Sequence, residues 1–155
     1  MQTLGRHYVP WFNLKYQRTG SLWEGRFRAT VLDAASYFLP CAQLLEYQPV
    51  LDGLATEMEA WPWSSHAHHV GLRKDALLTD HPIYWALGNT PFDREAVYKR
   101  RCETPPDLRL GEAVDEATRK GWALGQEYFL QQIGKQTERR LQPARRGRPS
   151  KQSTA

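Results

Sequence analysis

Apolar and aromatic residues recur at intervals of three and four near the start of the chain. Between positions 3 and 17 they are Leu4, Tyr8, Trp11, Phe12 and Tyr16. This spacing places them on one face of an α-helix. Pro10 lies inside the segment, where a proline costs on the order of 3 kcal/mol. We predict an amphipathic helix over 3–17, with an apolar face that needs a packing partner.

The next pattern is a loop, a strand and a helix. Residues 20–27 are rich in glycine, aromatic and basic side chains, and residues 28–32 form an apolar, β-branched run that predicts a strand. Asp33 then has the chemistry of a helix N-cap, and the mainly apolar segment after it ends at Gln48-Pro49. Pro40 lies within this second predicted helix.

Further along, the pattern is helical throughout. We expect a short helix begun by Asp80 as N-cap with Pro82 in its first turn, and a helix over 94–102 with Tyr98 facing inward. The segment 104–106 is a linker. Two helices follow, over 110–120 and 126–137, and the residues expected on their shared face are Ala113, Ala117, Tyr128, Phe129 and Ile133. Such a pair is either a helix-turn-helix or a plain helical hairpin, and the low basic content of its second helix favours the hairpin.

Several uncommon residues occur in a specific order across the first 65 positions. The run G-x-L-W-x-G-R-F starts at Gly20, the predicted second helix closes with Glu46, Pro49, Val50 and Gly53, and W-P-W-S-S occupies 61–65. The order and spacing resemble the REP-associated tyrosine transposases, relatives of the IS200/IS605 single-tyrosine transposases. We expect the two tryptophans of W-P-W to cover a helix end.

The resemblance implies an activity and a set of reagents. Family members cut single-stranded DNA with a helical tyrosine, while a His-hydrophobic-His motif on an upstream strand holds a divalent metal such as Mg²⁺. The tyrosine lies four residues before the Asn of N-P-V, so its place is taken here by Leu44, and the Asn is Gln48. Tyr47 lies three residues along the helix, which is a rotation of about 300° and a shift of about 4.5 Å.

The metal-binding strand has no counterpart before the first residue. We therefore expect an N-terminally truncated α+β chain, mainly helical as it stands, with no cofactor of its own. Its predicted parts are the C-terminal portion of a ferredoxin-like transposase domain at 1–66, a helical accessory region at 67–138 and a disordered basic tail at 139–155.

The sequence does contain one His-x-His, within His66-Ala67-His68-His69. On a strand, His66 and His68 would share a face and could hold a metal. However, this motif follows the tyrosine helix rather than preceding it, and Ala67 is small where the family has a bulky apolar residue. We expect a polar surface segment in contact with DNA.

The net charge of +4 is concentrated at two places. Residues 1–31 hold five basic side chains and one acidic one, and residues 139–151 hold six basic side chains and no acid. Basic clusters of this kind favour nucleic acid as partner, and a solvated surface is the alternative. In the first cluster we expect Arg18, Arg26 and Arg28 to contact phosphate. Trp23 either stacks on a base or, with Phe27, fills the core, and the core is favoured.

The tail carries its own DNA-binding pattern. Arg146-Gly147-Arg148-Pro149 is similar to the core of an AT-hook, which lies in the narrow minor groove of A·T-rich duplex DNA. The basic side chains expected to contact DNA are Arg145, Arg146, Arg148 and Lys151.

Composition narrows the remaining choices. No apolar run reaches the length of a membrane span, so a cytoplasmic location is expected. Cys41 and Cys102 are far apart and outside any C-x-x-C spacing, which favours two idle thiols. The main hypothesis is an inactive, DNA-binding, transposase-like chain, alone or as a homodimer. Two alternatives remain open: an enzyme that uses Tyr47 with metal ligands from a partner subunit, and a remnant that neither binds nor cuts DNA.

Overall fold

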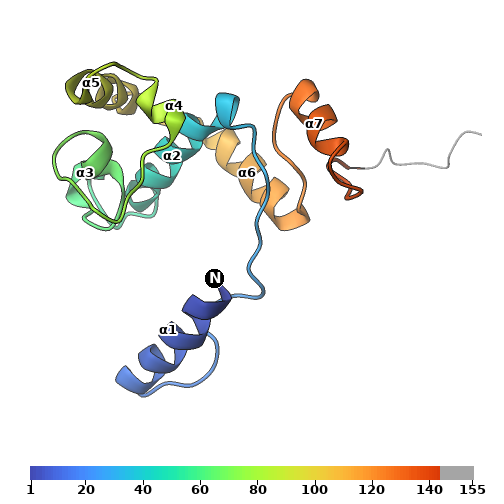
Figure 1. Ribbon diagram of the computed structural model, residues 1–155. Helices are drawn as coiled ribbons and strands as arrows, with labels where there is room; N and C mark the ends of the chain where they lie inside the picture. The colour runs from blue at the N-terminus through green and yellow to red at the C-terminus, as the bar shows by residue number, and fades with distance from the viewer. Residues whose placement is uncertain (144–155) are drawn as a thin grey trace, which may run out of the picture.

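The computed structural model describes residues 1–143, which form a mainly helical chain (Figure 1). The segments are α1 (Gln2–Lys15), α2 (Ala34–Leu51), the 3₁₀ turn η1 (Met58–Ala60), α3 (His66–His69), α4 (Pro82–Trp85), α5 (Pro91–Cys102), α6 (Leu108–Lys120) and α7 (Glu127–Gly134). None of these helices is both long enough and apolar enough to cross a membrane.

The predicted first helix is confirmed as α1, which begins one residue early and ends two residues early. Together with the loop after it, α1 lies apart from the other helices and is joined to them by an extended stretch of chain (Figure 1). None of its side chains is buried. Its aromatic residues contact one another and Trp23, with ring centroids 5.6 Å apart for Tyr8 and Trp11 and 6.4 Å apart for Tyr8 and Trp23.

The predicted strand over 28–32 is wrong. Among the described residues this segment makes one isolated parallel bridge, between Leu32 and Leu124. The Leu124 amide donates to the Val31 carbonyl at 2.9 Å, and the Asp33 amide donates to the Leu124 carbonyl at 2.7 Å. A strand needs a neighbour along its whole length to pair its backbone groups, and here the neighbouring segment pairs at a single residue.

Helix α2 is the element against which α4, α6 and η1 pack. Asp33 caps it as predicted, accepting a hydrogen bond from the Ala35 amide at 3.2 Å. The helix runs to Leu51, two residues beyond the predicted end at Pro49, although a proline at this position removes one hydrogen bond of the helix. Asp52 is the C-cap, and Gly53 follows with a positive φ of 68°.

Helices α3, α4 and α5 lie together on one side of α2 (Figure 1). The N-cap of α4 is His81, not the predicted Asp80: His81 Nδ1 accepts from the Ile83 amide at 3.1 Å. Tyr98 faces inward as predicted and is buried in a small core with Val70 and Tyr84. The partly buried hydrophobic residues around this core are Phe38, Leu39, Leu87 and Cys102.

Helix α6 packs against α2, where Gly111 leaves room for Leu44: a Cβ at Gly111 would lie 3.4 Å from Leu44 Cδ2. The predicted shared face of α6 and α7 is wrong for Tyr128, which is 72% exposed, while Ala117 is buried as expected. The apolar surface of α2 gives α6 a partner, so α7 is not required to cover it. Trp63 is 84% exposed and covers no helix end, contrary to expectation.

Candidate functional site

The most heavily hydrogen-bonded side chain in the described part of the chain is the carboxylate of Glu46. It lies on the inner face of α2, and its side chain is 2% exposed. A buried carboxylate is stable only when donors replace the water that it has lost. The residues that follow α2 in sequence supply all four of the donors that contact the Glu46 carboxylate.

Four donors surround the two oxygens. Oε1 accepts from the Ser65 hydroxyl at 2.5 Å and contacts His69 Nδ1 at 2.6 Å. Oε2 accepts from the Tyr98 hydroxyl at 3.0 Å and contacts His66 Nδ1 at 3.2 Å. The carboxylate therefore ties α2 to α3 and to α5.

His66 is the most buried of the histidines and lies on the short helix α3. Its Nδ1 faces Glu46, and its Nε2 is buried without a hydrogen-bond partner, 3.6 Å from Glu59 Oε1. The prediction of a polar surface segment is wrong for this residue. The local sequence is polar, but the His66 imidazole is buried because it contacts the Glu46 carboxylate.

The two other histidines of α3 have different partners. His69 bonds Glu46, whereas His68 Nδ1 accepts from the Asp75 amide at 3.1 Å and His68 Nε2 lies 3.3 Å from Asp80 Oδ1. Because the segment is a helix and not a strand, His66 and His68 do not form a His-x-His pair on one face. The metal motif that the resemblance implies does not fit these residues.

The pKa values of three side chains in the cluster differ strongly from their ordinary values. Burial alone would raise the pKa of Glu46, but hydrogen bonds from His66, His69 and Ser65 hold that pKa at about 2. Burial alone would lower the pKa of His66, but the neighbouring Cys102 and the Glu46 carboxylate raise it to about 10. Burial and the Glu46 charge raise the pKa of Tyr98 well above its usual range, so its hydroxyl remains a donor. At neutral pH, Glu46 is therefore a carboxylate and His66 is an imidazolium.

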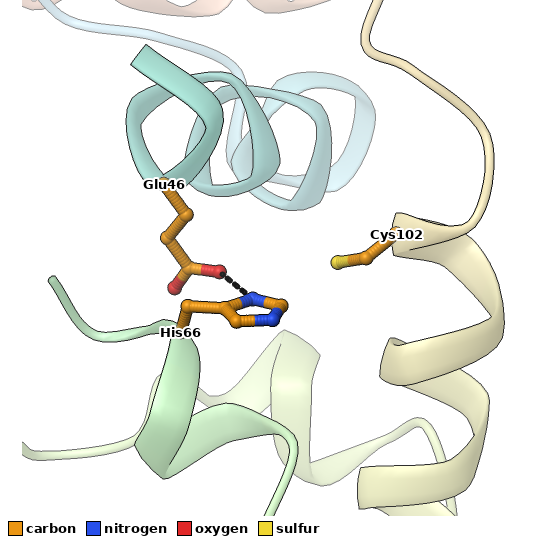
Figure 2. A group of neighbouring side chains, drawn as sticks. All are labelled: Glu46, His66 and Cys102. Carbon is orange, nitrogen blue, oxygen red and sulfur yellow. Dashed lines mark hydrogen bonds and ion pairs between the residues drawn. The ribbon is translucent and has the colours of Figure 1, made fainter. Parts of the chain in front are cut away.

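Cys102, at the end of α5, points toward the same two groups (Figure 2). One ligand atom each from Glu46, His66 and Cys102 lies within 4.8 Å of the other two. Oxygen, nitrogen and sulfur donors thus converge from three helices, and the described residues could hold a metal ion here. Catalysis on a large substrate at this place is unfavourable, since Glu46 and His66 are both buried.

The predicted DNA-contacting residues lie elsewhere, around α1. Trp23 is 51% exposed and Phe27 is 69% exposed, so the core interpretation of this pair is wrong. Arg18 and Arg26 are exposed, and Arg26 lines a pocket of about 560 Å³ with Trp23. Arg28 is also exposed, but it donates to the Arg119 carbonyl at 2.6 Å and so joins the extended segment to the end of α6.

Two further predicted sites are the candidate nucleophile Tyr47 and the basic tail, and only Tyr47 lies within the described residues. Tyr47 is half-buried on α2, and its hydroxyl has no hydrogen bond to another described residue. The structure does not bring it together with the basic residues around α1. Arg145, Arg146, Arg148 and Lys151 lie outside the described residues, so their proposed contact with DNA stays a prediction.

The sequence pattern does not predict the cluster as a unit. In the sequence, Glu46 and Ser65 belong to the pattern that resembles the transposases, and the position of Cys102 favours an idle thiol. The available signal was a glutamate in an otherwise apolar helix, which must find buried donors if the helix packs on both sides.

Comparisons with protein-family models, with curated proteins and with solved structures each found no match to this chain.

Proposed function

We propose that this chain is a DNA-binding protein related to the tyrosine transposases and that it does not itself cut DNA. The observation that carries the proposal is the exposed indole of Trp23, which lines one pocket together with the exposed residue Arg26; Arg18 is exposed in the same loop. An exposed aromatic ring offers a stacking surface for an unpaired base, and arginines close to it neutralise phosphate. This combination suits single-stranded or hairpin DNA.

Backbone geometry supports the relationship to transposases. Gly20, Gly25 and Gly53, three glycines of the shared pattern, all have positive φ, at 93°, 79° and 68°. Residues that have a Cβ atom rarely adopt a positive φ, so there is a physical reason for glycine at these positions of the pattern. Two other landmarks, Glu46 and Ser65, form a direct hydrogen bond. In the proposal, residues 1–66 correspond to the C-terminal part of a ferredoxin-like domain.

The lack of cutting follows from the position of Leu44. This residue stands where the family has its tyrosine, has no nucleophilic atom, and is 8% exposed because it lies against Gly111 of α6. Tyr47 lies three positions further along α2, about 60° around the helix and about 4.5 Å along its axis from Leu44. The family's His-hydrophobic-His ligands have no equivalent in residues 1–143, since His66 and His69 bond Glu46 and His68 Nε2 lies 3.3 Å from Asp80 Oδ1.

The binding test uses fluorescence anisotropy of a labelled single-stranded hairpin DNA with the full chain at fixed salt. Loss of one stacked base costs about 1–3 kcal/mol, so Trp23→Ala is expected to raise Kd about 5- to 160-fold. Trp63→Ala is the matched control, because Trp63 is more exposed and lies away from the basic loop. Equal Kd values for Trp23→Ala and the unaltered chain would contradict the proposal, as would an equal loss in Trp63→Ala.

A second comparison separates base stacking from general charge. Arg26→Ala is expected to weaken binding, whereas Arg109→Ala, at an exposed position at the start of α6, is expected to leave Kd within about twofold. If both variants bind equally weakly, the chain binds DNA as a diffuse polycation and the site around Trp23 is not the interface.

A further inference from the structure

We propose that Glu46, His66 and Cys102 form a zinc-binding site that holds α2, α3 and α5 together. The site goes beyond the proposed DNA binding and does not depend on it. It also differs from a transposase metal centre, because one of its ligands is a thiolate and none comes from a His-x-His pair.

The donor positions fit a four-coordinate ion. Zinc bonds of about 2.0–2.3 Å to O, N and S place neighbouring ligand atoms of a tetrahedron about 3.3–3.7 Å apart. Glu46 Oε2 and His66 Nδ1 are already 3.2 Å apart, and one ligand atom from each of Glu46, His66 and Cys102 lies within 4.8 Å of the others (Figure 2). To complete the tetrahedral arrangement, the half-buried Cys102 thiol at the end of α5 needs to move only slightly toward the ligand atoms of Glu46 and His66.

The surrounding groups form an ordered outer shell. The Tyr98 and Ser65 hydroxyls and His69 already orient the Glu46 carboxylate. His66 Nε2 is buried and has no hydrogen-bond partner, while Glu59 Oε1 lies 3.6 Å from it. If zinc takes Nδ1, the Nε2 proton can be donated to Glu59. A ligating histidine whose second nitrogen is held by a carboxylate is the usual arrangement at zinc sites.

Binding is an exchange of protons for metal. Zinc replaces the proton on His66 Nδ1 and the proton on the Cys102 thiol, and both protons go to solvent. The products are two metal–ligand bonds, a third bond to the Glu46 carboxylate, and an open fourth position for water. The soft sulfur donor favours zinc over Mg²⁺ or Ca²⁺, which take oxygen ligands.

The test titrates Co²⁺, a spectroscopic substitute for zinc, into the chelator-treated and reduced full chain. We expect saturation at one equivalent, with a thiolate-to-cobalt charge-transfer band and the intense visible bands of four-coordinate cobalt. The chain has two cysteines, which provide a matched pair of variants. Cys102→Ala is expected to abolish the charge-transfer band, and Cys41→Ala, buried within α2, is expected to retain it.

Three results would overturn the proposal. They are no charge-transfer band in the unaltered chain, a band that persists in Cys102→Ala, and a band that disappears equally in Cys41→Ala. Cobalt bound without that band, for example at His68, His69 and Asp80, counts against the site as well.

A second measurement covers variants that lose their fold. Zinc added in excess is expected to raise Tm of the unaltered chain and of Cys41→Ala, but not of Cys102→Ala. His66→Gln is expected to weaken cobalt binding by at least tenfold if its circular dichroism remains helical. If His66→Gln is unfolded, the two cysteine variants decide the question, because Cys102 is only partly buried against the core and Cys41 provides a matched thiol.

Discussion

The Tyr98 hydroxyl on α5 donates a buried hydrogen bond to Glu46 Oε2 on α2, and the two oxygens are 3.0 Å apart. Both side chains are at most 2% exposed, and the two residues are 52 positions apart in the chain. A hydrogen bond of this kind stabilises the packing of two helices only because it also satisfies a charge that water cannot reach.

The first prediction concerns this bond. Tyr98→Phe removes the hydroxyl and leaves the ring, so we expect a loss of about 1.5–3 kcal/mol in the free energy of unfolding, typical of a bond to a charged group. Urea unfolding followed by circular dichroism measures it. Tyr128→Phe at an exposed site is the control and is expected to change stability by less than about 0.5 kcal/mol. Similar losses in the two variants would show that the Glu46 bond contributes nothing specific.

The second prediction is a pH profile of stability for the metal-free chain. The pKa of Glu46 is lowered from its ordinary value of 4.5 to about 2 in the fold, so its contribution is present above pH 4.5 and is lost as pH falls toward 2. The pKa of His66 is raised from its ordinary value of 6.5 to about 10, so its contribution is present below pH 6.5 and is lost as pH rises toward 10. Both contributions are complete only between pH 4.5 and 6.5.

Since the two shifts describe largely one interaction, they do not add. We expect an acid limb that loses a few kcal/mol. Glu46→Gln should flatten this limb, whereas Glu116→Gln, on the exposed face of α6, should leave it in place. If Glu46→Gln and the unaltered chain lose the same stability at acid pH, the Glu46 carboxylate does not contribute to the stability of the fold.

The third prediction is that restoring a tyrosine at the family position does not restore cutting. Leu44→Tyr places a larger, polar side chain under Gly111 of α6, and overpacking of this kind costs about 1–3 kcal/mol. Labelled hairpin DNA with Mg²⁺ or Mn²⁺ should give no covalent adduct with either protein. An adduct formed by the unaltered chain and lost in Tyr47→Phe would instead establish an active enzyme.

The fourth prediction separates the three arginines of the first basic cluster. Removal of a phosphate contact lowers the slope of log Kd against log salt by about 0.7 for single-stranded DNA. We expect this change for Arg18→Ala and for Arg26→Ala. Arg28→Ala is expected to change the slope less, because its guanidinium donates to the Arg119 carbonyl. Three equal changes in slope would place Arg28 at the DNA as well.

The fifth prediction concerns the basic tail in the full chain. Arg146→Lys and Arg148→Lys are expected to reduce the preference for A·T-rich over G·C-rich duplex more than they reduce affinity, because a lysine keeps the charge but is more strongly hydrated. Competition between the two duplexes at one salt concentration measures the preference. Equal affinity of the unaltered chain for both duplexes would reduce the tail to a general polycation.

Several local features could be predicted from the sequence, because their causes lie within a few residues. The three- and four-residue spacing around Tyr8 predicted α1, the side chain of Asp33 predicted the start of α2, and Pro82 predicted the first turn of α4. A helix and its cap depend on backbone groups one turn away, so the relevant partners are visible in the sequence itself.

The tertiary structure decided which side chains are buried and with what. His66 lies in a polar segment, and Trp23 in an aromatic one, yet His66 is buried and Trp23 is half exposed. The burial of His66 depends on Glu46, 20 residues earlier, and the exposure of Trp23 follows from the separation of α1 from the other helices. The segment 28–32 had the composition of a strand, but a strand exists only where another segment pairs with it. Partners of this kind are set by the packing of distant helices, and no local pattern of residues specifies them.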